Sequence, residues 1–151
     1  MKTLMKQATT LAVVTLAACG VASANDHDTD DQCSEATLHG LYVFNASGFN
    51  VVGGVAQPKA IVELIRFHGD GTLAVPAATR SINGVISRPP RDGGGTYTLT
   101  PDCTGSLQFG PPGPTFDIFV APEDGQIHMI QTGPTTPGLP VLQGIVQRLS
   151  P

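Results

Sequence analysis

Apolar and polar residues alternate with a period of two along most of the chain after residue 33. In the segment 40–47, for example, Tyr42, Phe44 and Ala46 fall on one face and the residues between them on the other. Such alternation is typical of a β-strand, because successive side chains point to opposite faces of the sheet. No segment beyond the N-terminal one repeats with the period of an amphipathic helix. The pattern therefore predicts a chain built almost entirely of strands.

Turn-forming residues separate the alternating segments. The pair Asn83 and Gly84 is the strongest two-residue hairpin signal, and the segments 69–71 and 123–125 combine glycine with acidic residues. A further turn contains Cys103, and the proline- and glycine-rich segment 88–95 is expected to be a loop. These turns divide the chain into about eight short strands that follow one another as a meander.

The strands are expected to pair antiparallel, in an up-and-down order, as a single domain over residues 35–151. A closed barrel and a two-sheet sandwich are the two architectures open to such a meander. Closure is favoured, because a closed barrel has no exposed strand edges, whereas an open meander leaves its edges free to pair with other chains. The predicted fold class is therefore all-β, an antiparallel closed barrel of about eight strands.

Composition supports this fold and limits the partners. Glycine (18) and proline (13) are frequent, tryptophan is absent, and charged residues make up 13% of the chain, as expected for short strands joined by many turns. The formal net charge is −4, and two of the few cations, Lys2 and Lys6, lie in the N-terminal segment. No nucleic-acid partner is expected, because phosphate recognition needs a basic surface. No cofactor is expected either.

The N-terminal segment has the pattern of an export signal, in which lysines precede an apolar run (11–18) too short to span a bilayer. Small residues ending at Ala24 suit signal peptidase and predict a signal peptide over residues 1–24. The alternative is "LAAC", which resembles a bacterial lipobox and would make 1–18 a lipoprotein signal with Cys19 lipidated. The protein is therefore expected in the cell envelope by a lipid anchor, or periplasmic or secreted. Only the lipid would bring it to a membrane.

The segment 25–34 is acidic and is expected to be a disordered linker before the barrel. Its alternating aspartates from Asp26 imitate the start of a calcium-binding EF-hand loop. Asp31, however, stands where that loop needs glycine, and Thr37 stands where it needs a bidentate glutamate. The sequence therefore predicts no metal site.

The cysteine count predicts one disulfide. Of the three cysteines, Cys19 leaves the pool of free thiols by cleavage or by lipidation, so Cys33 and Cys103 remain. An even pair in an exported chain is most simply a disulfide, although two unrelated buried thiols are the alternative.

Residues in the first and last predicted strands resemble the pattern of a known group of barrels. "GLY" at 40–42 and Arg148 near the end of the last strand look like the calycin pattern of lipocalins and avidins, in which a basic residue covers a tryptophan. Tyr42 replaces that tryptophan, and it either stacks with Arg148 or both are simply barrel-end residues. The segments 33–48 and 95–105 are also similar to segments of uncharacterised exported bacterial proteins. The resemblance implies a calycin-like barrel and no particular activity.

The sequence contains no catalytic motif with the required spacing. His68 and Asp70 are close in sequence, but a turn accounts for the aspartate. Glu63 and Arg66 lie on opposite faces of one strand, so one of them is expected to point into the barrel. That charge would either meet a polar group of a ligand or reach water at the barrel mouth.

The preferred function is a non-enzymatic exported barrel that binds a small apolar or amphipathic ligand. A barrel filled by its own side chains, serving as an envelope structural or protein-interaction domain, is the alternative, and an isomerase- or cyclase-like barrel enzyme is third. The volume of the interior distinguishes the filled barrel from the other two. The candidate ligand-binding residues are Tyr42, Phe44, Tyr97, Leu99, Phe109, Phe116 and Met129.

Overall fold

The computed structural model of the protein describes residues 32–91, 93–134 and 140–149. The export signal, Cys19 and most of the acidic linker lie outside these residues. A short 3₁₀-helix, η1 (Glu35–Thr37), precedes the strands. The strands are β1 (His39–Val52), β2 (Val55–His68), β3 (Thr72–Ile82), β4 (Val85–Ser87), β5 (Gly93–Leu99), β6 (Thr104–Phe109), β7 (Thr115–Ala121), β8 (Gln126–Gly133) and β9 (Val141–Arg148).

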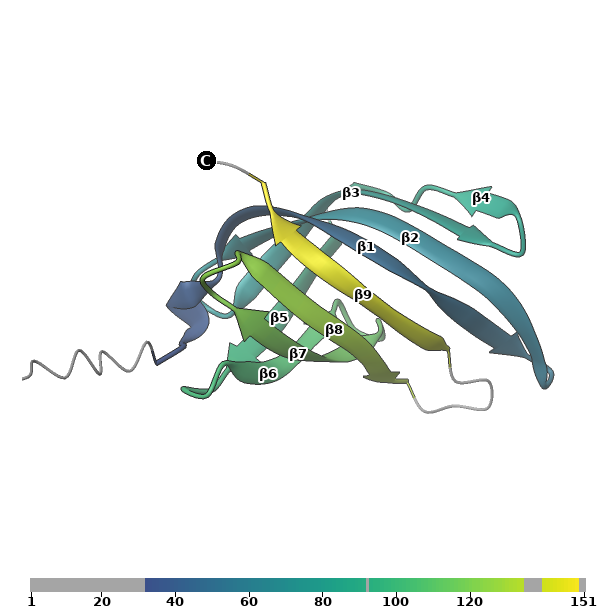
Figure 1. Ribbon diagram of the computed structural model, residues 1–151. Coiled ribbons are helices and arrows are strands. Elements are labelled where there is room, and N and C mark those ends of the chain that lie inside the picture. The colour runs from purple at the N-terminus through teal and green to yellow at the C-terminus, as the bar shows by residue number, and fades with distance from the viewer. Residues whose placement is uncertain (1–31, 92, 135–139, 150–151) are drawn as a thin grey trace, which may run out of the picture.

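Eight of these strands form a closed antiparallel barrel (Figure 1), which confirms the predicted fold class. Each barrel strand pairs with the next barrel strand along the chain, β3 pairs with β5, and β9 returns to pair with β1. The remaining strand, β4, pairs only with the end of β3, with which it forms a hairpin at the edge of the sheet. This up-and-down order is consistent with a calycin-like fold. The sandwich alternative is excluded by the continuous pairing around the barrel.

The predicted hairpin turns are present. Asn83 and Gly84 both have positive φ (49° and 82°), as the tight turn between β3 and β4 requires. The predicted loop over 88–95 is wrong in its last three residues, because Gly93 to Gly95 begin β5. Glycine is needed there: a Cβ at Gly95 would collide with the Gln108 carbonyl oxygen of the next strand. A close approach between strands, rather than a turn, explains this part of the glycine run.

One end of the barrel is closed by η1 and a packed aromatic cluster. Leu38, directly after η1, is only 2% exposed. Phe67 makes edge-to-face contacts with Tyr42 and Tyr97, at ring-centroid distances of 5.2 and 5.1 Å. Such contacts add stability beyond that of burial alone. The sequence pattern did not predict η1, because a single turn of helix has no period to detect.

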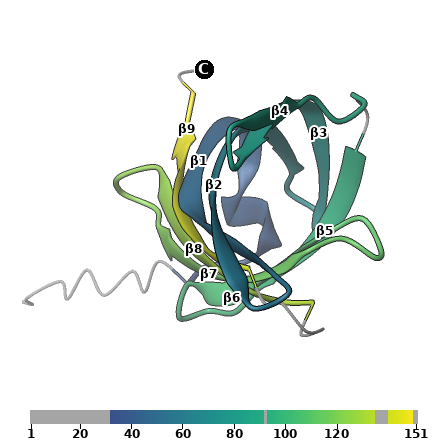
Figure 2. The same cartoon turned by 90° about the vertical axis from the view of Figure 1, so that its right-hand side faces the viewer.

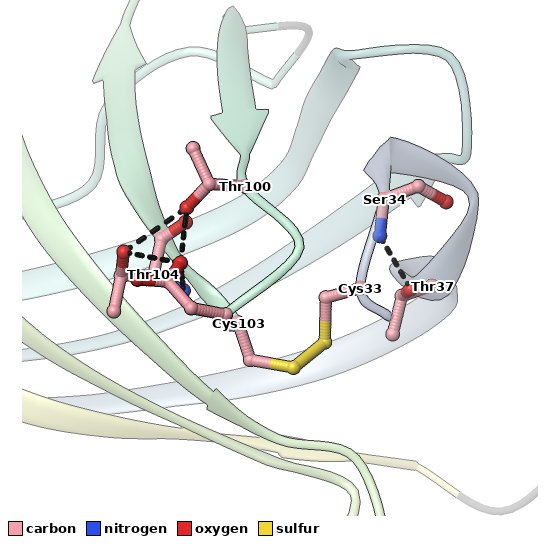
Figure 3. Close-up of a disulfide and its surroundings, with 7 residues drawn as sticks. Cys33, Ser34, Thr37, Thr100, Cys103 and Thr104 are labelled. Atoms are coloured by element: carbon pink, nitrogen blue, oxygen red, sulfur yellow. Dashed lines mark hydrogen bonds between the residues drawn. A yellow bond between two sulfur atoms is a disulfide. The ribbon is translucent and has the colours of Figure 1, made fainter. Parts of the chain in front are cut away.

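Cys33 and Cys103 form a disulfide, which confirms the predicted pair (Figure 3). Their Cα atoms are 5.0 Å apart, and the bond joins the residues before η1 to the turn between β5 and β6. The Cys33 N–H also donates to the Pro101 carbonyl oxygen at 3.1 Å. Cys33 is buried, so ordered structure begins before residue 35, the predicted domain boundary. A disulfide is typical of proteins that fold in an oxidising, exported environment.

No helix among residues 32–91, 93–134 and 140–149 has both the length and the apolar character needed to cross a membrane.

Candidate ligand-binding cavity

A cavity of about 330 Å³ occupies the end of the barrel opposite η1. Figure 2 looks into this open end, with η1 at the far end of the barrel. The rings of Phe44 and Phe109 each meet Phe116 edge to face, at centroid distances of 5.9 and 5.6 Å. These three rings form an aromatic side of the cavity, and the other apolar lining residues include Ile61, Val75 and Leu142.

The seven candidate ligand-binding residues divide into two groups. All point inward, as the alternation predicted. Phe44, Phe109 and Phe116 line the cavity. The other four are buried in the packed part of the core and do not line it: Tyr42, Tyr97, Leu99 and Met129.

Of the pair Glu63 and Arg66 on β2, Glu63 faces the interior, whereas Arg66 is exposed on the outside. It lies opposite Phe44 of β1 and Ala78 of β3, so its immediate surroundings are apolar. Its Oε1 atom is buried and has no hydrogen-bond partner. Burial raises the pKa of the Glu63 carboxyl from 4.5 to about 7. One oxygen of the carboxyl is therefore withheld from water, although the residue as a whole is half-buried.

Gln131 on β8 brings a second buried acceptor into the cavity. Its Nε2 donates to the Gly133 carbonyl oxygen at 2.7 Å. This bond sets the orientation of the amide, because exchanging N and O would place two acceptors against each other. The Gln131 Oε1 atom is left buried without a partner.

Two cations, Lys59 and Arg80, also line the cavity. Burial, together with the charge of Arg80, lowers the pKa of Lys59. The Arg80 Nε donates to the Ser87 Oγ of β4 at 2.7 Å, so the β3–β4 hairpin positions the guanidinium. Like charges on one face repel each other, and this cluster of cations is suited to an anion.

A bulge in β3 brings Arg80 to the interior side. The register between β2 and β3 shifts between Leu64 and Arg66, so that Val75 and Pro76 together oppose one residue of β2. Before this bulge odd-numbered residues of β3 face inward, as Val75 does; after it, Ala78 and Arg80 line the cavity. A bulge is one of the few places where a strand tolerates proline.

Sequence reasoning missed Lys59, Arg80 and Gln131. Lys59 and Gln131 could have been found by extending the alternation, since they share a face with Ile61 and Met129 respectively. Arg80 could not, because simple alternation across the bulge assigns it to the outer face.

Tyr42 and Arg148, on which the calycin resemblance rests, lie directly opposite each other on β1 and β9. They are at the closed end, away from the cavity. Burial raises the pKa of the Tyr42 hydroxyl, and the nearby Arg148 charge partly offsets this shift. Neither residue lines the cavity.

The pair His68 and Asp70 has a structural explanation. Asp70 Oδ1 accepts hydrogen bonds from the Thr72 N–H (3.0 Å) and the Thr72 hydroxyl (2.6 Å), which stabilise the β2–β3 turn. These bonds lower the pKa of Asp70. Within the described part of the chain, no group of three His, Cys, Asp or Glu side chains is placed to hold a metal ion.

A second hollow lies on the outer surface of the barrel, across β1, β2, β7, β8 and β9. It contains exposed apolar side chains, among them Val62, Phe119 and Ile130. Any experiment on ligand binding must distinguish this outer hollow from the interior cavity.

No protein-family model matches the chain, and no curated protein or solved structure is significantly similar to it. The likeness to calycins therefore rests on topology, and the similarity to exported bacterial proteins stays a prediction.

Proposed function

We propose that this protein is an exported binding module that holds a small amphipathic molecule in the open half of its barrel. The cavity of about 330 Å³ beside Glu63 carries the proposal. Binding sites for small molecules are typically concave and mostly apolar, with a few placed polar groups and a volume from about 300 Å³ upward. The cavity has this composition, with aromatic and aliphatic sides and two buried oxygen atoms.

A barrel of this size has an interior that side chains can just fill. The closed half of this barrel is filled in that way, by Tyr42, Phe67 and Tyr97. In the open half, Gly93 and Gly94 line the cavity without side chains. In a purely structural barrel, an apolar residue in place of Glu63 would increase stability, because a buried acceptor without a partner costs about 1–3 kcal/mol. These features favour binding over the filled-barrel alternative.

Proton-transfer catalysis is a second candidate, favoured by the raised pKa of Glu63 alone. A carboxyl with a pKa of about 7 can act as a general acid or base near neutral pH. Exchange of carbon-bound hydrogen of a bound ligand for solvent deuterium, abolished by Glu63→Gln, would support it. Binding without such exchange would support the binding function and reject proton-transfer catalysis.

The absence of tryptophan makes a single-tryptophan assay possible. Phe109→Trp places a reporter in the cavity lining, and Phe119→Trp places a matched one in the outer hollow, at a side chain 51% exposed. Both variants are titrated with an apolar dye that quenches tryptophan. We expect saturable quenching with one site in Phe109→Trp and none in Phe119→Trp. Quenching of Phe119→Trp alone, or of neither variant, would overturn the proposed function.

A further inference from the structure

The charged groups of the cavity lie at different depths, which the register between β2 and β3 defines. Glu63 is opposite Ala78, whereas Arg80 is opposite Ile61, further from η1 along β2. Lys59 is further again, opposite Ile82. At roughly 3.3 Å per residue, Arg80 lies about 7 Å and Lys59 about 13 Å beyond Glu63 along the strand. Glu63 therefore lies further inside the cavity than the two cations, and Gln131 lines the same cavity from β8.

We propose that the ligand is an amphipathic anion with a hydrogen-bond donor at its inner end. The donor, a hydroxyl or an amide N–H, binds Glu63 Oε1 and Gln131 Oε1. The anionic group binds Lys59 and Arg80, and the apolar part between them packs against Phe44, Phe109 and Phe116. This inference rests on the proposed function, because it assumes that the cavity is the binding site.

Above about pH 7, where the Glu63 carboxyl is ionised, both free atoms of the inner end are acceptors, so this end selects a donor. The Gln131 amide has already used a donor on the Gly133 carbonyl oxygen, and only its buried oxygen is left. A ligand with a purely apolar inner end would leave both oxygens without partners. Sites built to hydrogen-bond a ligand group discriminate strongly against analogues that lack it, for this reason.

The outer end selects an anion because it contains two cations, Lys59 and Arg80. Among the described residues that line the cavity, the acidic one is Glu63, which lies further inside. The pKa shift of Glu63 has burial as its cause and no contribution from either cation. The charge of Arg80 instead contributes to lowering the pKa of Lys59. A carboxylate or phosphate between them would remove this repulsion and accept hydrogen bonds from the guanidinium.

A series of probes with the same chain length tests the two ends separately. The series consists of ω-hydroxydecanoate, with both groups; decanoate, with the anion only; decanol, with the hydroxyl only; methyl decanoate, with neither; and decylamine, with the opposite charge. Calorimetric titration of the unmodified protein gives the affinities. We expect ω-hydroxydecanoate to bind best, with losses of about tenfold for removal of the hydroxyl or of the charge.

One variant for each end of the cavity tests which residue causes each preference. Gln131→Met keeps the size of the side chain and removes the inner acceptor, so it should reduce the preference for ω-hydroxydecanoate over decanoate severalfold. Arg80→Met should reduce the preference for decanoate over methyl decanoate and leave the hydroxyl preference unchanged. Gln143→Met, on the outer face of β9, is the matched control and should change neither.

Each outcome decides one proposal. Equal affinity for ω-hydroxydecanoate and decanoate would overturn the inner donor, and tighter binding of decylamine than of decanoate would overturn the anion. Failure of every probe while the dye still quenches Phe109→Trp would reject this ligand class and leave the binding function in place. Failure of probes and dye together would reject both.

Discussion

The hydroxyl of Tyr97 on β5 lies 2.7 Å from the carbonyl oxygen of Glu35 and 3.1 Å from that of Leu38. Its proton is donated to these two oxygens, which belong to η1 and to the residue after it. The bond therefore ties the element that closes the barrel to the barrel wall. It also satisfies a helix end that has few partners of its own.

Removing this hydroxyl should loosen the closed end. We expect Tyr97→Phe to lower the free energy of unfolding by about 1–2 kcal/mol, because buried carbonyl oxygens lose their donor. Urea unfolding measures the change. Thr96→Ala, on the exposed face of the same strand, is the control and should change stability by less than about 0.5 kcal/mol. Equal losses in the two variants would contradict the role assigned to Tyr97.

The disulfide should also stabilise the closed end of the barrel. Cys33 and Cys103 are separated by 70 residues, and the loop-entropy relation gives about 4 kcal/mol for a loop of this length. We expect the double substitution Cys33→Ser with Cys103→Ser to lower the melting temperature markedly. Unreduced, denatured protein should contain neither Cys33 nor Cys103 as a free thiol in an alkylation assay, and two alkylated cysteines would refute the bond.

Glu63 should make stability fall as pH rises. Its pKa is about 7 in the folded protein and near 4.5 when unfolded, so the folded state binds more protons between these values. Unfolding free energy should therefore decrease from about pH 4.5 to about pH 7, by about 3 kcal/mol at most, and be level above that range. The charged groups that share its cavity are Lys59 and Arg80.

The substitution Glu63→Gln isolates this effect from other titrations. It should be more stable than the original protein at about pH 8, and the difference should disappear near pH 4.5. Urea unfolding across this pH range measures both proteins under identical conditions. A constant difference at all pH values would mean that Glu63 ionises normally in the fold.

The N-terminal prediction is tested by fractionation in a bacterial host. If Cys19 is lipidated, the protein should be in the membrane fraction, and Cys19→Ala should move it to the soluble fraction. Each buried methylene of an acyl chain contributes about 0.8 kcal/mol, and the acidic segment that follows has no attraction for anionic lipid. A mature protein that begins at Asn25 without acyl mass would establish the other cleavage site.

Most of the fold could be predicted from the sequence because alternation and turn residues act locally. Asn83 and Gly84 predicted their hairpin, since few residues accept positive φ. The glycines at the start of β5 misled the prediction, because glycine serves both turns and close strand contacts. Only the packing of Gly95 against β6 distinguishes these uses.

The site was less predictable, for a physical reason. Alternation assigns a side chain to a face, and it identified Phe44, Phe109 and Phe116 as inward residues. It says nothing of which inward residues pack against one another and which border a cavity. Tyr97 and Phe116 have the same pattern in the sequence, but Tyr97 packs beneath η1 and Phe116 lines the cavity. That distinction depends on which end of the barrel is closed.

Gly144 on β9 should be essential for the packing of the cavity side. A Cβ at this position would lie 2.7 Å from Phe44 Cε2 and 2.7 Å from Ala46 Cβ, and would also collide with the Asn45 carbonyl oxygen. Backbone cannot yield as a flexible side chain can, so we expect Gly144→Ala to lower the free energy of unfolding by about 1–3 kcal/mol. It should also weaken ligand binding, because Phe44 must move.

The matched control for this substitution is Gly94→Ala, in which the new Cβ would be 3.6 Å from its nearest neighbour, the Leu73 carbonyl oxygen. That is an ordinary contact, and φ at Gly94 is not positive. Gly94→Ala should therefore change stability little, although the same methyl group is added to a strand glycine near the cavity. Equal destabilisation by both substitutions would mean that loss of glycine itself, and not the contact with Phe44, determines the effect.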